Sequence, residues 1–246
     1  MLRRYETIYS PAIGRDMQVL AYGHYGDPLI VFPSGGGAFH DFEDNGMIDA
    51  IAWLIDAGKL KLYCPESLDS ESWLSGNDPH WKAVRHNAYQ AFVLDNLVPT
   101  IRYDCHDDNI KIALTGCSIG AYHAVNFALK YPEIFPYALG MSGRYDVAKF
   151  AGHSESEEVY FNNPTAYVAN FHDGHLDYVR ANTHIALVCG QGAWEHKSLE
   201  DTRRLADLLA EKQISHERDI WGHDVEHHWY WWRKQIAYHL GKALDH

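Results

Sequence analysis

The spacing of apolar residues along the chain predicts strands and helices in alternation. Short apolar runs with β character recur along the sequence, and the segments between several of them repeat apolar residues at helical spacing. The predicted strands are 2–9, 17–22, 29–32, 60–64, 112–114, 137–141, 185–189 and 215–220. The predicted helices are about 44–57, 81–103, 121–130, 197–212 and 229–244. Such alternation predicts an α/β fold, a mostly parallel central sheet of about eight strands with helices on both faces.

The length of 246 residues suits one α/β domain spanning 1–246. Turn residues between the first two strands predict a hairpin. Two excursions interrupt the alternation, at 65–86 and 144–183. Both are rich in aromatic and polar residues, and we expect them to form a lid or to line a pocket. Within the second excursion, Pro164 is expected at the first positions of a short helix.

One predicted strand runs directly into the sequence Gly116-Cys117-Ser118-Ile119-Gly120, and helical spacing follows it. A strand that turns sharply into a helix at a serine flanked by glycines is typical of the nucleophile elbow of α/β-hydrolases. Side chains at Gly116 or Gly120 would collide with the neighbouring strand or helix. The pattern indicates Ser118 as a nucleophile, and a glycine-rich turn with a surface serine is the alternative.

A second glycine-rich segment follows the predicted strand at 29–32. Gly35, Gly36 and Gly37 stand where an α/β-hydrolase needs one donor of its oxyanion hole, and no Gly-Lys-Ser/Thr follows to make a phosphate loop. The other donor is expected from the backbone of Ile119. Which residue of 34–37 serves stays open.

A serine nucleophile needs a base, and the base needs an orienting carboxylate. In α/β-hydrolases these follow the serine in the order acid, then histidine, each behind a strand. Glu195 lies in the loop behind the strand at 185–189, with Glu200 and Asp201 as alternatives, and two histidines, His223 and His227, follow the last strand. From the residues alone, both histidines remain candidates for the base.

The whole chain resembles the putative-esterase (esterase D-like) family of α/β-hydrolases, which includes S-formylglutathione hydrolases and mycobacterial mycolyltransferases. The matching segments are 115–124 around the elbow, Met141-Ser142-Gly143, and 221–232, which contains His227-His228-Trp229-Tyr230-Trp231-Trp232. In that family the catalytic histidine opens a His-Asp/Ser-Trp-x-x-Trp motif. The resemblance therefore implies His227 as the base, although His228 departs from the usual Asp or Ser.

The same resemblance implies Glu195 as the acid, because the family usually has an Asp at that distance from the strand. It leaves His223 as a pocket residue beside the base. The candidate substrate contacts are therefore His223, Cys117 next to the nucleophile, and Trp73 in the first excursion.

Composition narrows the function further. A net charge of −12 argues against a nucleic-acid partner. No apolar run approaches the length of a membrane span, and no apolar stretch follows Arg3 and Arg4 as in a signal peptide. Four dispersed cysteines favour reduced thiols, so we expect a cytoplasmic enzyme. The sequence leaves a homo-oligomer open.

Seventeen histidines invite a metal hypothesis, but HExxH and Cys/His zinc spacings are missing and His223, His227 and His228 have no obvious further ligand. We expect no metal and no cofactor. The predicted function is a serine hydrolase acting on a small-molecule carboxylic ester. An acyltransferase or thioesterase with the same triad, a non-catalytic binding member of the fold and a histidine-based metallohydrolase are the alternatives.

Overall fold

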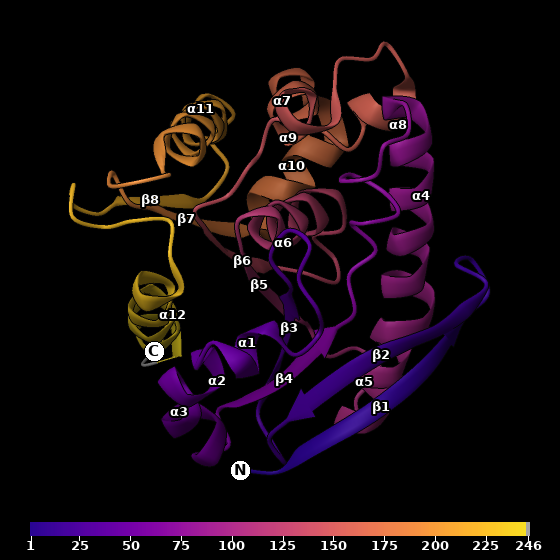
Figure 1. Ribbon diagram of the computed structural model, residues 1–246, viewed down its shortest axis with the longest axis vertical. Helices are drawn as coiled ribbons and strands as arrows, with labels where there is room; N and C mark the ends of the chain where they lie inside the picture. Colours follow the sequence, from indigo (N-terminus) through magenta and orange to yellow (C-terminus); the bar gives the residue numbers. More distant parts are fainter. Residues whose placement is uncertain (245–246) are drawn as a thin grey trace.

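The computed structural model describes residues 1–244 and contains one eight-stranded sheet with helices on both faces (Figure 1). The strand order is β1-β2-β4-β3-β5-β6-β7-β8. The strands are β1 (Arg3–Ser10), β2 (Arg15–Tyr22), β3 (Asp27–Phe32), β4 (Leu60–Pro65), β5 (Ala113–Cys117), β6 (Tyr137–Met141), β7 (His184–Cys189) and β8 (His216–Ile220). The predicted fold class is confirmed.

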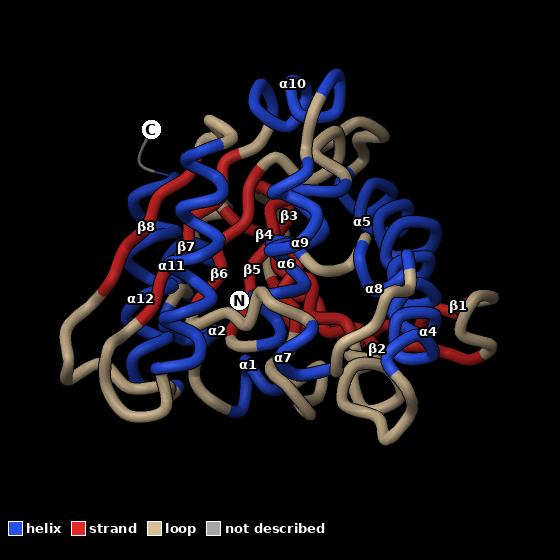
Figure 2. Tube along the Cα trace, turned by 90° about the horizontal axis from the view of Figure 1, so that it is seen from above, coloured by secondary structure: helices blue, strands red, loops and turns tan. Residues whose placement is uncertain are grey.

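The first two strands form the predicted antiparallel hairpin at one edge of the sheet, and β2 also pairs antiparallel with β4. From β4 through β3 and β5 to β8 all pairings are parallel. Figure 2 shows β1 and β8 at opposite ends of the sheet. Parallel strands end at the same edge, so the loops after β3, β5, β7 and β8 emerge together there.

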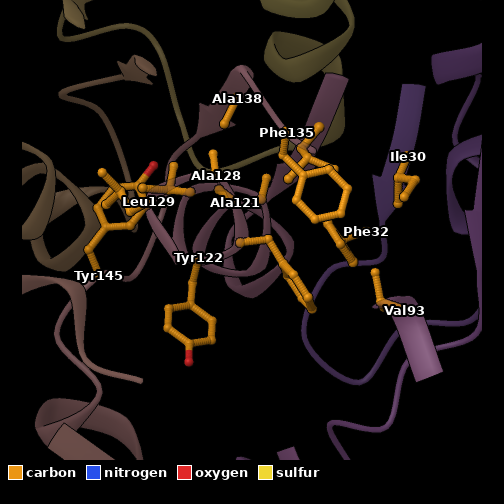
Figure 3. Close-up of a cluster of buried hydrophobic side chains, with 14 of the residues drawn as sticks. Ile30, Phe32, Val93, Ala121, Tyr122, Ala128, Leu129, Phe135, Ala138 and Tyr145 are labelled. Atoms are coloured by element: carbon orange, nitrogen blue, oxygen red, sulfur yellow. The ribbon is translucent and has the colours of Figure 1, made fainter. Parts of the chain in front are cut away.

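Alternating residues of the strands divide the interior into two cores. Ile30 and Phe32 of β3 belong to one core, whereas Leu29 and Val31 of the same strand belong to the other. This period of two is what a strand buried on both faces requires. Figure 3 shows part of the first core, where Phe32, Tyr122 and Phe135 lie close to the helix that follows β5.

The helices fall into two groups that cover the two cores (Figure 1). One group comprises α1 (Asp41–Asp44), α2 (Met47–Ala50), α3 (Ala52–Asp56) and α12 (Trp229–Leu244). The other comprises α4 (Pro79–Phe92), η1 (Val93–Leu97), α5 (Val98–Cys105), α6 (Ile119–Lys130), α7 (Ala148–Ala151), α8 (Glu157–Tyr160), α9 (Pro164–Tyr167), η2 (Val168–Asn170), α10 (Asp173–Asn182) and α11 (His196–Glu211). Within residues 1–244, no helix has the length and hydrophobicity needed to cross a membrane.

Two predicted helices differ from those observed. The helix expected at 44–57 is broken into three short ones, because Gly46 adopts a left-handed conformation with φ of 68° and Ile51 leaves helical geometry. The helix expected at 81–103 begins at Pro79 and contains one π-helical turn, η1, just before Pro99. Because proline lacks an amide hydrogen, the widened turn accommodates it without breaking the helix.

Candidate active site

Ser118 lies in a strained turn between β5 and α6. Its φ of 57° and ψ of −117° are rare for a residue with a side chain and cost of order 1–3 kcal/mol. A Cβ on Gly116 would lie 2.3 Å from the carbonyl carbon of Gly120, and a Cβ on Gly120 would lie 2.4 Å from the carbonyl oxygen of Phe32. The prediction that both glycines are required by crowding is confirmed. The turn has the geometry of a nucleophile elbow.

Glu195 and His227 meet at the carboxyl edge of the sheet. Glu195 directly precedes α11 and is fully buried, whereas the His227 side chain, in the loop between β8 and α12, is 21% exposed. Glu195 Oε2 lies 3.1 Å from His227 Nδ1. A carboxylate facing Nδ1 holds the proton on that nitrogen, so Nε2 is left as the acceptor. Two residues 32 positions apart thus form an acid–imidazole pair.

Backbone hydrogen bonds between two loops hold this pair together. Gly192 N–H donates to the Val225 carbonyl at 2.8 Å, and His227 N–H donates to the Ala193 carbonyl at 3.0 Å. Any side chain at Gly190 would place its Cβ 2.1 Å from the same Val225 carbonyl oxygen. The loop after β7, which contains Glu195, is therefore held against the loop after β8, which contains His227.

Ser142 and Trp232 complete the surroundings of the acid, and the sequence analysis assigned neither a role. Ser142 Oγ donates to Glu195 Oε1 at 2.5 Å and accepts from Trp232 Nε1 at 2.9 Å. The Trp232 ring also packs edge-on against His227, with ring centroids 4.8 Å apart. Both residues lie in segments that resemble the esterase family, Met141-Ser142-Gly143 and His227 to Trp232, and this was the one sign in the sequence that they could matter.

A thiol also contacts the acid. Cys189 Sγ lies 3.4 Å from Glu195 Oε2. Burial, together with the nearby Glu195 carboxylate, raises the pKa of the Cys189 thiol. The thiol therefore stays protonated and can serve as a weak donor to the carboxylate.

The glycine loop after β3 lies beside the elbow. A Cβ on Gly35 would lie 3.1 Å from Ile119 Cδ1. Gly37 N–H donates to the Ser34 carbonyl at 2.9 Å and Ala38 N–H donates to Asp41 Oδ1 at 3.0 Å, so both amides are engaged within the loop. Of the three predicted glycines, Gly35 and Gly36 remain the candidates for an oxyanion donor.

Two of the residues predicted as substrate contacts, Trp73 and Cys117, are buried in this structure. Trp73 is fully buried and packs against His86 and Phe150, because residues after β4 fold inward over α4. Cys117 is also fully buried and belongs to the core on the α12 side, where burial raises the pKa of its thiol. Neither side chain is accessible to a substrate in this structure.

The alternative acids and base are placed differently from Glu195 and His227. Glu200 and Asp201 both pair with Lys149, at 2.8 Å each. His223 is exposed, and in the part of the chain that the structure describes its ring forms no hydrogen bond with Glu195. Likewise, the hydrogen bonds of residues 1–244 do not include one between Ser118 Oγ and either histidine.

Over residues 1–244, one group of three side chains has metal-ligand spacing, and it does not include the histidines at 223, 227 and 228. It consists of Glu217, Asp219 and His239. Lys242 Nζ already pairs with Glu217, and Trp221 Nε1 donates to Asp219. These partners satisfy the carboxylates without an ion.

Comparison with known proteins identifies the family. The model of the family described as "Putative esterase" matches residues 10–243. The chain belongs to this esterase family. The resemblance seen in the sequence is confirmed, and so is the expectation of a carboxylesterase among the serine hydrolases. No curated protein matches the sequence.

Solved structures with the same fold cover nearly all of the esterase chain. A ferulic acid esterase is 14% identical, with a TM-score of 0.77 over 96% of this chain and 95% of that one. The S-formylglutathione hydrolase of Agrobacterium tumefaciens is 15% identical, with a TM-score of 0.75 over 99% and 94%. MPT51 of Mycobacterium tuberculosis is 15% identical, with a TM-score of 0.74 over 98% of each chain. At these identities the likeness shows a shared fold.

Proposed function

We propose that this protein hydrolyses a carboxylic ester through an acyl-enzyme on Ser118, with His227 as general base and Glu195 as the orienting acid. The observation that carries the proposal is the 3.1 Å contact between Glu195 Oε2 and His227 Nδ1, at the sheet edge where the elbow carries Ser118. Nδ1 is occupied by the acid, so Nε2 is the nitrogen available to a hydroxyl.

In the first half-reaction, His227 Nε2 takes the proton of Ser118 Oγ as the oxygen attacks the ester carbonyl. Collapse of the tetrahedral intermediate breaks the bond to the alcohol, which receives the proton from His227. In the second, His227 deprotonates a water that attacks the acyl-enzyme, and Ser118 Oγ leaves with the proton. The products are the acid and the alcohol.

The negative charge that develops on the carbonyl oxygen needs two backbone donors. Ile119 N–H opens α6, where the first amides of a helix have no partner within it. The candidate for the second donor is the amide of Gly35, because Gly35 lies against Ile119. The amide of Gly37 already donates to the Ser34 carbonyl. No metal or cofactor takes part in this scheme.

The test compares Ser118→Ala, His227→Ala and His223→Ala in hydrolysis of p-nitrophenyl acetate. We expect the first two to lower kcat by at least about 10⁴-fold, since members of a triad act as a unit. His223→Ala is the matched control and should change kcat less than about threefold. Full activity in Ser118→Ala would refute the proposal, and a greater loss in His223→Ala than in His227→Ala would refute the choice of base.

Added alcohol, sugar or thiol acceptors decide between hydrolysis and acyl transfer, because any nucleophile that the site admits can resolve an acyl-enzyme. We expect free acid as the main product. Acylated acceptor as the main product would reassign the protein as an acyltransferase with the same three residues.

A further inference from the structure

A cavity of about 480 Å³ lies against the far end of α6, away from the elbow. It is lined by residues of α6, α8, α9, η2 and α10, among them Lys130, Tyr131, Tyr160, Tyr167, Phe171 and His175. These helices lie together on one side of the sheet (Figure 1). Lys130 is the last of the 12 residues of α6, so it lies roughly 18 Å along the helix from Ser118.

Aromatic rings form most of the cavity wall. The rings of Tyr167 and Phe171 pack with centroids 5.2 Å apart, and Phe171 packs edge-on against His175 at 4.9 Å. Each of the three lining tyrosine hydroxyls has a hydrogen-bond partner, and two of these partners, Gln90 and Asn126, do not line the cavity. Tyr131 donates to Gln90, Tyr167 donates to Asn126, and Tyr160 accepts from Asn170. The wall therefore offers mainly ring surface, with the Tyr160 hydroxyl and Asn170 as polar groups beside it.

Lys130 brings a positive charge to this apolar wall. Its Nζ donates to Asn162 Oδ1 at 2.9 Å, an oxygen that also accepts from Gln90 Nε2 at 2.8 Å. Within residues 1–244 no carboxylate pairs with Lys130, and no Asp or Glu lines the cavity, although the chain has 33 acidic residues. Burial lowers the pKa of Lys130 to about 8, so the ammonium persists at pH 7.

A mostly buried cation without a counter-charge is costly, and an anion that reaches it gains a strong hydrogen bond. The volume is within the range of small-molecule sites, of about 300–1,000 Å³. Aromatic walls with one fixed cation select a flat ring that carries an anionic group.

We propose that this cavity is a second ligand site, separate from the catalytic residues, that binds aromatic carboxylates with the carboxylate on Lys130. The ring lies among Tyr131, Tyr160, Tyr167 and Phe171. This inference does not depend on the proposed esterase activity.

Calorimetric titration with benzoate tests the site in the native protein. We expect benzoate to bind at least about tenfold more tightly than benzamide, which has the same shape without the charge, and more tightly than cyclohexanecarboxylate, which has the charge without the aromatic ring. Equal affinity for benzoate and benzamide, or no binding of benzoate, would overturn the proposal without any variant being needed.

Variants then locate the bound benzoate. Lys130→Met should weaken binding at least about tenfold, since the variant removes the charged donor to the carboxylate. Phe171→Leu should weaken it several-fold while leaving the fold intact. His227→Ala, in the proposed catalytic site, should leave it unchanged. Loss of binding in His227→Ala with normal binding in Lys130→Met and Phe171→Leu would assign benzoate to the catalytic site and refute a second one.

Discussion

Ser142, the residue that follows β6, forms a hydrogen bond with the proposed acid, Glu195. It has a left-handed φ of 52° directly after the strand, and its hydroxyl stands between Trp232 Nε1 and Glu195 Oε1. A buried carboxylate needs a donor for each oxygen. His227 contacts one oxygen of Glu195 and Ser142 contacts the other. Ser142 therefore fixes the orientation of the Glu195 carboxylate relative to the imidazole.

Removal of that hydroxyl should cost activity without affecting substrate binding. In Ser142→Ala we expect kcat to fall about tenfold or more at nearly unchanged KM, since a lost hydrogen bond to a buried charge costs about 1.5–3 kcal/mol. Trp232→Phe is the companion variant; it removes the donor to Ser142 and should produce a smaller loss. Wild-type kcat in Ser142→Ala would show that Glu195 is held without it.

For single residues, the sequence predicted the candidate acid and base better than it predicted which side chains contact them. The acid and base candidates followed from their order behind successive strands and from a family motif, and the structure brings Glu195 and His227 together. The contribution of Ser142 could not be predicted, because it depends on contacts among Ser142 just after β6, Glu195 just before α11, and Trp232 in α12. The burial of Trp73 could not be predicted either, since an aromatic residue in a long loop can fold inward as readily as outward.

The elbow depends on the close approach of two elements, β3 and α6. Gly120 is the second residue of α6, and a Cβ there would lie 2.4 Å and 2.5 Å from the carbonyl oxygens of Phe32 and Pro33. Backbone atoms of a central strand cannot move aside without disturbing the sheet. The glycine therefore sets the distance at which the serine turn lies above the strand.

Gly120→Ala should consequently destabilise the protein by at least about 2 kcal/mol and abolish esterase activity. Gly174→Ala is the matched control, because Gly174 is the second residue of α10 and an added Cβ meets no atom within 4 Å. The control should leave stability unchanged or raise it by up to about 1 kcal/mol. Chemical unfolding curves measure both, and equal stability of the two variants would contradict the packing argument.

Element types were predicted more reliably than their interruptions. All eight strands were expected, and central ones such as β3 and β7 contain continuous apolar runs because they are buried on both faces. The breaks at Gly46 and in the π-helical turn depend on backbone conformations that periodicity does not encode. The excursion at 144–183 is held by a polar network; Asn162 Oδ1 accepts from Gln90, and its carbonyl accepts from Tyr122. Such contacts between distant elements leave no periodic pattern in the sequence. The role of this excursion as a lid stays a prediction.

For the whole molecule, buried thiols couple stability to pH. Burial raises the pKa of Cys64, Cys117 and Cys189 above the ordinary value of 9.0. Above about pH 9 the unfolded chain loses these protons while the folded protein keeps them, so the free energy of unfolding falls as pH rises. Below pH 9 both states hold the protons and the contribution is constant.

Each thiol should lower the free energy of unfolding by up to about 1.4 kcal/mol per pH unit above pH 9. We expect Cys64→Ala to be less stable than the native protein at pH 8 and to lose less stability between pH 9 and 10.5. Urea unfolding at several pH values measures the slope. An identical slope in the variant would show that Cys64 does not contribute to it.

In the proposed mechanism, Ser118 is an activated nucleophile served by His227 and Glu195. Mass-spectrometric mapping after reaction with a fluorophosphonate tests it most directly, because the probe reacts with an activated serine and reports its position. We expect one adduct per chain, on the peptide containing Ser118, with labelling strongly reduced in His227→Ala and abolished by unfolding. An adduct on another serine, or no adduct on a protein that hydrolyses p-nitrophenyl acetate, would contradict it.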